Sequence, residues 1–175
     1  TGVSPERIFE EFKKGAKQGG WNYGSQLARF GFARHALGND ARSPVPVATA
    51  INENSISHTE LATLMLPPKK DHDLHNRAWP NADVRAVNAA QMVLSRMWSK
   101  DTFWMLHKAF KNGANMSDMR HVAQVSKIDT EVIKAVSEWE VTTDGNDVVS
   151  EGFTGPEIGE EIKRREFDRF SRIHN

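Results

Sequence analysis

The chain has 175 residues, of which 38% are hydrophobic, and its 23 basic and 23 acidic side chains give a formal net charge of zero. This length accommodates one ordinary domain or two small helical subdomains, and the neutral balance provides no global field that would attract a polyanion. The absence of cysteine excludes a disulfide scaffold and thiolate metal sites, and no apolar run is long enough to span a bilayer. We therefore expect a cytoplasmic protein without a membrane partner.

The N-terminal part of the chain is predicted to form two helices and a loop. Ser4-Pro5-Glu6 is a helix start, with a hydroxyl N-cap, a proline in the first position and an acid in the first turn. Gly19-Gly20 is expected to stop this helix. A second helix is predicted over residues 21–37, and a loop with two prolines over residues 38–54. Residues 1–54 are thus expected to form one unit.

Residues 55–175 are predicted to form a second, helical unit. Ser57-His-Thr-Glu60 is a capping-box pattern that precedes an apolar stripe, and the two prolines at 67 and 68 end that helix. Apolar residues at helical spacing predict further helices from residue 82 and over residues 102–111, 117–126 and 130–139. No strand alternates convincingly anywhere in the chain. The predicted fold class is all-α, a helical bundle.

The last part of the chain is electrically polarised. Residues 144–161 hold six acidic side chains and no basic one, whereas residues 163–172 hold five basic and two acidic side chains. Residues 142–155 are expected to be irregular, and a final helix is predicted from Pro156 to about Ile173, with Ile158, Ile162 and Ile173 on one face and Phe170 at its edge. Arg165, Arg169 and Arg172 follow at helical spacing and form a ridge beside that face. Arginine suits bidentate phosphate contacts, but cations near a helix C-terminus also complement its dipole.

Two further features are candidate ligand sites. Asp71-His-Asp-Leu-His75 concentrates metal-ligand side chains, but its spacing fits neither a zinc finger nor a helical His pair, and we expect a solvated loop. Gly155-Pro156 places free backbone N–H groups at the start of the final helix, where an anion can bind. Glu157 and Glu160 already occupy that first turn, which favours a structural cap.

The glycine-rich segment of residues 144–162 resembles a segment of a known enzyme family. Its sequence, DGNDVVSEGFTGPEIGEEI, is similar to the motif near the end of class II tRNA nucleotidyltransferases (CCA-adding enzymes) and bacterial poly(A) polymerases. The segment SPERIFEEF at residues 4–12 is similar to the helix that opens the neck region of the same family. The two segments occur in the family's order and frame nearly the whole chain. The resemblance implies an all-α neck, body and tail.

The resemblance also implies what the parts do. In the family, the positions of Arg7 and Glu11 brace the nucleotide-selecting helix, and the body and tail grip the tRNA acceptor arm through its backbone. The catalytic head precedes the neck helix, and its metal-binding, ribose-binding and base-selecting motifs are not found in this sequence. We therefore expect no catalytic residue and no metal ligand on this chain. Mg²⁺ and ATP or CTP are implied for the head alone.

The leading hypothesis is therefore an RNA-binding portion of a CCA-adding or poly(A)-polymerase-like enzyme. It would position the 3′ end of a tRNA or another RNA for a catalytic head supplied in cis or in trans. The candidate RNA-binding residues are Arg164, Arg165, Arg169, Arg172 and Gly155. The alternatives are a stand-alone, non-catalytic RNA-binding module and a helical protein-interaction domain.

Overall fold

The structure, a computed structural model, describes residues 2–44, 56–67, 72, 74–95 and 98–174. Within these residues the chain forms helices and no strand, which confirms the all-α prediction. The elements are α1 (Pro5–Arg29), α2 (Ala33–Leu37), α3 (His58–Met65), the 3₁₀ helix η1 (His75–Arg77), α4 (Asn81–Leu94), α5 (Lys100–Lys111), α6 (Met116–Ser126), α7 (Thr130–Ser137), α8 (Gly145–Ser150) and α9 (Pro156–His174).

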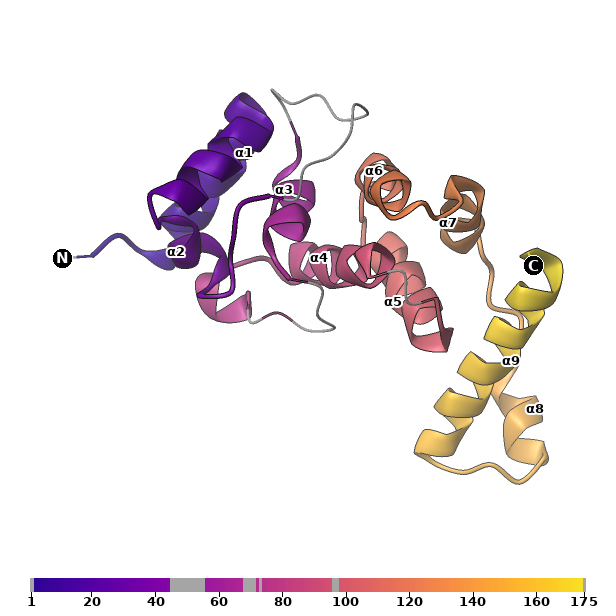
Figure 1. The fold of residues 1–175 in the computed structure, drawn as a ribbon. Coiled ribbons are helices and arrows are strands. Elements are labelled where there is room, and N and C mark those ends of the chain that lie inside the picture. Colours follow the sequence, from indigo (N-terminus) through magenta and orange to yellow (C-terminus); the bar gives the residue numbers. More distant parts are fainter. Residues whose placement is uncertain (1, 45–55, 68–71, 73, 96–97, 175) are drawn as a thin grey trace.

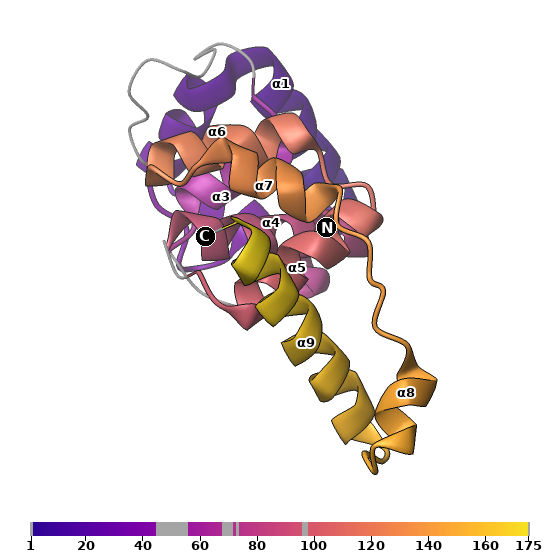
Figure 2. The same ribbon diagram turned by 90° about the vertical axis from the view of Figure 1, so that its right-hand side faces the viewer.

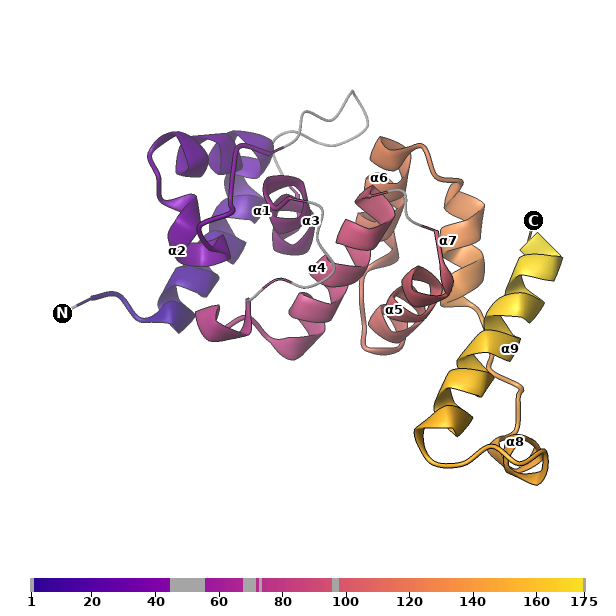
Figure 3. The same ribbon diagram turned by 60° about the horizontal axis from the view of Figure 1, so that its bottom comes forward.

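The helices follow one another along an elongated molecule. Helices α1 and α2 lie at one end, α3 to α7 form the middle, and α8 and α9 lie at the other end (Figure 1). The two termini are therefore far apart, which a second view confirms (Figure 3). Seen from the C-terminal side, α8 and the first half of α9 project away from the remaining helices (Figure 2). This projecting part contains the motif that resembles the nucleotidyltransferases.

Helix α4 lies at the centre because it contributes to two buried clusters. One cluster joins α1, α2 and α3 with Val84 and Val87 of α4. The other joins α5, α6, α7 and α9 with Ala86, Ala90 and Val93 of α4. Positions on different faces of one helix thus belong to different cores. The predicted unit boundary between residues 54 and 55 lies outside the described residues.

Helix α1 differs from the prediction in how it ends. Gly20 has a positive φ of 49° with non-helical ψ and kinks the helix where a stop was expected, but the chain then continues as helix to Arg29. The second predicted helix, residues 21–37, is broken at Phe30–Phe32. Gly31 has φ 72° there, and the N–H of Phe32 donates to the Leu27 carbonyl at 2.8 Å. Only residues 33–37 form a separate helix, α2.

Most predicted helix starts are confirmed by their caps. The Ser4 hydroxyl accepts from the Arg7 N–H, and the Ser57 hydroxyl accepts from the Glu60 N–H at 3.0 Å. The N-caps of α5, α6 and α7 are Ser99, Asn115 and Asp129, so two of these helices begin one or two residues before the predicted start. Helix α4, predicted from residue 82, begins one residue earlier at Asn81 and ends at Leu94.

The expectation of irregular structure over residues 142–155 is wrong in part. Asp144 is the N-cap of the short helix α8, and its carboxylate accepts from the Asn146 N–H at 2.8 Å. The side chain of Val148 is completely buried against α9 and fixes α8 there. The sequence pattern missed α8 because six residues are too few to show helical periodicity.

Candidate functional site

The turn between α8 and α9 depends on two glycines. Gly152 has φ 99° and Gly155 has φ 53°, both in the region that side chains other than glycine rarely adopt. No atom lies within 4 Å of a Cβ at either position, so backbone conformation, rather than crowding, requires glycine there. Helix α8 closes with the Gly152 N–H donating to the Val149 carbonyl at 3.0 Å. The glycine spacing of the motif is thus explained by the turn.

The start of α9 is closed by its own residues. The N–H groups of Glu157 and Ile158 donate to the carbonyls of Thr154 and Gly155 at 3.1 and 3.3 Å. The Glu157 carboxylate accepts from the Thr154 N–H at 3.4 Å. These two N–H groups are therefore engaged within the turn, and the assignment of Gly155 as an RNA-binding residue stays a prediction. The geometry agrees with the structural-cap interpretation.

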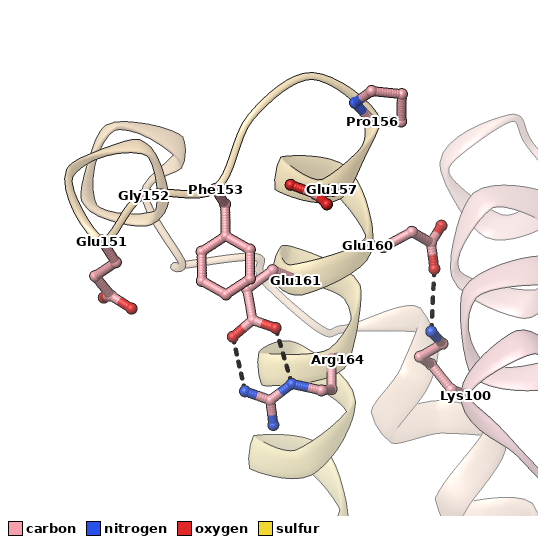
Figure 4. A pocket seen from close by; sticks show the side chains of 9 residues that line it. All are labelled: Lys100, Glu151, Gly152, Phe153, Pro156, Glu157, Glu160, Glu161 and Arg164. Atoms are coloured by element: carbon pink, nitrogen blue, oxygen red, sulfur yellow. Dashed lines mark hydrogen bonds and ion pairs between the residues drawn. The ribbon is translucent and has the colours of Figure 1, made fainter.

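A cleft of about 600 Å³ lies between α8, the start of α9 and the first residue of α5 (Figure 4). Four glutamates line it against two cations; the charged residues are Glu151, Glu157, Glu160, Glu161, Lys100 and Arg164. Glu160 binds Lys163 and Lys100, and these hydrogen bonds lower the pKa of Glu160 to about 2. Lys163 and Arg165, which pair with these glutamates, balance the remaining charge, so the cleft offers no surplus of cations to a phosphate.

Arg164 and Arg165 share one carboxylate. Both guanidinium groups bind Glu161, at 2.7 Å for Arg164 Nη2 and 2.8 Å for Arg165 Nε. The hydrogen bonds from Arg164, and then those from Arg165, lower the pKa of Glu161 to about 2. Arg164 also binds Asp168. Arg165 forms a bidentate ion pair with Glu151, the C-cap residue of α8. Both arginines, which were predicted to bind phosphate, thus already form ion pairs with carboxylates of the same chain.

Glu166 is a residue that the sequence analysis did not single out. Its side chain is completely buried, and its carboxylate accepts from the Trp139 Nε1–H, from the N–H groups of Thr142 and Thr143, and from Arg169. Burial alone raises the pKa of Glu166, but these hydrogen bonds and that of the Thr143 hydroxyl outweigh burial and lower the pKa to about 2. Glu166 therefore fastens α9 to the segment that follows α7.

Arg169 completes this attachment. Its Nη2 donates to the Glu166 carboxylate at 2.5 Å and to the Glu140 carbonyl at 2.6 Å. Its guanidinium also lies 4.2 Å from the centre of the Trp139 ring, a cation–π contact. Arg169 is thus the least available of the predicted RNA-binding residues. In the sequence, Trp139 is the signal for this attachment, because its indole N–H needs an acceptor when it is buried. Spacing along the chain does not identify Glu166, 27 residues away, as that acceptor.

Arg172 has a different environment. It is exposed, and its Nε donates to the Asp168 carbonyl at 3.3 Å. The neighbouring Ile173 is 61% exposed and lies outside the contact surface of α9, whereas Ile158 and Ile162 of the predicted face are half-buried. Phe170 and Glu166 are the buried centre of that surface instead. Within the described residues Arg172 is the one predicted arginine without a carboxylate partner.

Arg7 and Glu11 lie at the other end of the molecule, on α1. They line a cleft of about 540 Å³ whose walls are mainly apolar and include Phe12, Tyr23 and Phe32. Val3 and Phe32 beside it are 62% and 58% exposed. The structure thus places both predicted brace residues at one apolar cleft, far from α9.

The structure tests the metal and membrane expectations only over the residues that it describes. Asp71 and Asp73 lie outside them; His72 and Leu74 are buried, so the expectation of a solvated loop is wrong for these two residues. No group of three or more histidine or carboxylate side chains in the described chain is arranged to hold a metal ion. None of the described helices is both long and apolar enough to cross a membrane.

Comparisons with known proteins add no relative. A scan of family models found no match to this chain, and searches of curated proteins and of solved structures found none either. The resemblance to nucleotidyltransferases therefore rests on the segments at residues 4–12 and 144–162.

Proposed function

We propose that this chain is the RNA-binding portion of a CCA-adding or poly(A)-polymerase-like nucleotidyltransferase. The observation that carries the proposal is the turn between α8 and α9. The motif that resembles the family has glycines at positions 152 and 155, and both adopt positive φ. Pro156 then opens α9, as its fixed φ favours. A motif whose residue types are explained by its backbone supports a common fold in this segment.

The RNA is a tRNA or another RNA with an accessible 3′ end. Phosphoryl transfer depends mostly on positioning and on metal electrostatics, so a helical body that holds the RNA contributes to rate without supplying chemistry. Contacts to sugar and phosphate suit an A-form acceptor stem, because its deep, narrow major groove hides the bases. The elongated array of helices supports this role by offering a long surface (Figure 1).

The ion pairs of α9 restrict which arginines contact phosphate. Arg165 and Arg169 would have to exchange internal carboxylates for phosphate, at the cost of the tail attachment. Arg172 needs no such exchange, whereas Arg164 is 56% exposed but pairs with Glu161 and Asp168. On this proposal Arg172 contributes directly, and Arg165 and Arg169 shape the tail.

The apolar cleft on α1 supports a catalytic head as a second partner. Exposed Val3 and Phe32 offer apolar area, while Arg7 and Glu11 offer opposite charges that fix an orientation. The same cleft favours the alternative of a helical protein-interaction domain. RNA binding distinguishes the two functions.

The test is fluorescence anisotropy with a labelled tRNA acceptor-stem hairpin that lacks CCA. We expect a Kd on the order of 1–100 µM at low salt, weakening steeply as salt rises. Addition of a family catalytic head in trans is expected to incorporate CMP or AMP, with Mg²⁺ and CTP or ATP present. Absence of RNA binding at low salt would contradict the proposal and leave the protein-interaction alternative.

A further inference from the structure

A hollow of about 420 Å³ lies between α1, α3 and α6, away from the tail. Figure 1 shows α3 between the other two helices, and α3 packs against both. We call it the α1–α6 hollow; the residues used below are Lys13, Lys17, Ser57, Glu60, Asp118 and His121. Its lining combines cations on α1 with carboxylates on α3 and α6.

The cationic side of the α1–α6 hollow consists of Lys13 and Lys17. They are one turn apart on α1, and both are exposed. Neither has an ion-pair partner in the part of the chain that the structure describes. This differs from Arg165 and Arg169, whose charges are balanced by internal carboxylates. An anion bound here would displace no internal contact.

The opposite side of the hollow presents hydrogen-bond acceptors. Asp118 Oδ2 accepts from the Ser57 hydroxyl at 2.7 Å, and the partly exposed Asp118 has no second donor among the described residues. Glu60 is only 2% exposed, and its Oε2 lies 3.4 Å from His121 Nδ1. Its Oε1 is buried without a hydrogen-bond partner. That oxygen is closed to a ligand in the hollow, so Asp118 is the carboxylate that a ligand can reach.

Resting on the proposed RNA-binding function, we propose that the α1–α6 hollow binds one ribonucleotide unit of RNA, with phosphate on Lys13 and Lys17 and a ribose hydroxyl on Asp118. The charges fix the orientation, because the carboxylates repel phosphate and accept from hydroxyl groups. The 2′-hydroxyl is the group that distinguishes RNA from DNA. The hollow thus supplies both phosphate affinity and discrimination between the two nucleic acids.

The test compares RNA and DNA strands of identical sequence by anisotropy over a range of salt concentrations. Lys13→Ala/Lys17→Ala is expected to weaken binding of both strands and to flatten the log–log salt dependence by about 0.7–0.9, because the neutralisation of one phosphate is lost. The matched control is Lys108→Ala/Lys111→Ala, which removes two exposed lysines about one turn apart on α5. Equal effects of the two double variants would overturn the proposal.

Two further variants test the discrimination between RNA and DNA. Asp118→Ala is expected to reduce the preference for RNA over DNA about tenfold while leaving the salt dependence unchanged. Ser57→Ala loses the same internal hydrogen bond and the N-cap of α3 but keeps the carboxylate, so the folded variant, checked by circular dichroism, retains the preference. An unchanged preference in a folded Asp118→Ala variant would overturn the ribose assignment. If the wild-type chain binds no RNA, the proposed function fails; if it binds RNA and the hollow variants match their controls, only this inference fails.

Discussion

Two cationic surfaces of this protein look alike in sequence and differ in structure. On α9, Arg165 and Arg169 are held by Glu151, Glu161 and Glu166. On α1, Lys13 and Lys17 follow the same one-turn spacing and have no carboxylate partner among the described residues. The difference shows that helical spacing locates charges but does not say whether they are already used. The engaged arginines stabilise the tail, and the free lysines are available to a ligand.

Of the substitutions that test this comparison, Glu166→Gln is expected to have the largest effect on stability. The substitution removes the charge that five donors share, so we expect a loss of about 3 kcal/mol in the free energy of unfolding. The melting temperature would fall by about 6–12 °C. Glu157→Gln is the control, since Glu157 is exposed and forms no ion pair in the described chain. Similar melting temperatures for the two variants would show that the attachment of α9 does not depend on Glu166.

The pH dependence of stability tests the same carboxylate. The pKa of Glu166 is lowered in the folded protein to about 2 from its ordinary 4.5. Its contribution is therefore fully present above about pH 4.5 and is lost as pH falls toward about 2. Chemical denaturation at a series of pH values should give a steeper acid loss for the wild type than for Glu166→Gln. Parallel curves would contradict the assignment.

Arg169→Lys compares an engaged cation with a free one. Lysine keeps the charge but cannot reproduce the planar contact with Trp139 together with the bonds to Glu166 and the Glu140 carbonyl. We expect a loss of about 1–2 kcal/mol by thermal or chemical denaturation. Lys13→Ala should change stability by less than about 0.5 kcal/mol, because its side chain is exposed and unpaired in the described structure. Equal losses would remove the distinction between the two surfaces.

Gly152→Ala tests the turn that brings Glu151 to Arg165. Because φ is 99° at Gly152, alanine is strained there, and we expect a loss of about 1 kcal/mol. Gly159→Ala is a matched control inside α9, where nothing lies within 4 Å of the added Cβ. That substitution should stabilise the protein by about 0.5–1 kcal/mol, because alanine favours helix. Stabilisation by both alanines would refute the conformational role of Gly152.

More of the fold than of the candidate site could be predicted from the sequence. Caps such as Ser57 and the proline that opens α9 depend on neighbouring residues, so local pattern located these helix starts. The break at Gly31 and the short α8 were missed, because a single glycine does not fix a helix end and six residues are too few to show helical periodicity. The partners of Glu166, like the pair of Glu60 and His121, are distant in sequence. Spacing along the chain therefore predicted where the cationic side chains lie, but not which of them are neutralised by carboxylates.

The salt dependence of RNA binding tests the central claim most directly. It should be measured by anisotropy for the wild type, for Lys13→Ala/Lys17→Ala and for Arg165→Ala, with folding checked by circular dichroism. The free-lysine account predicts a salt dependence flatter by about 0.7–0.9 in the lysine variant and nearly unchanged in the arginine variant. A flatter dependence for Arg165→Ala with no change in the lysine variant would contradict it and assign the phosphate contacts to α9.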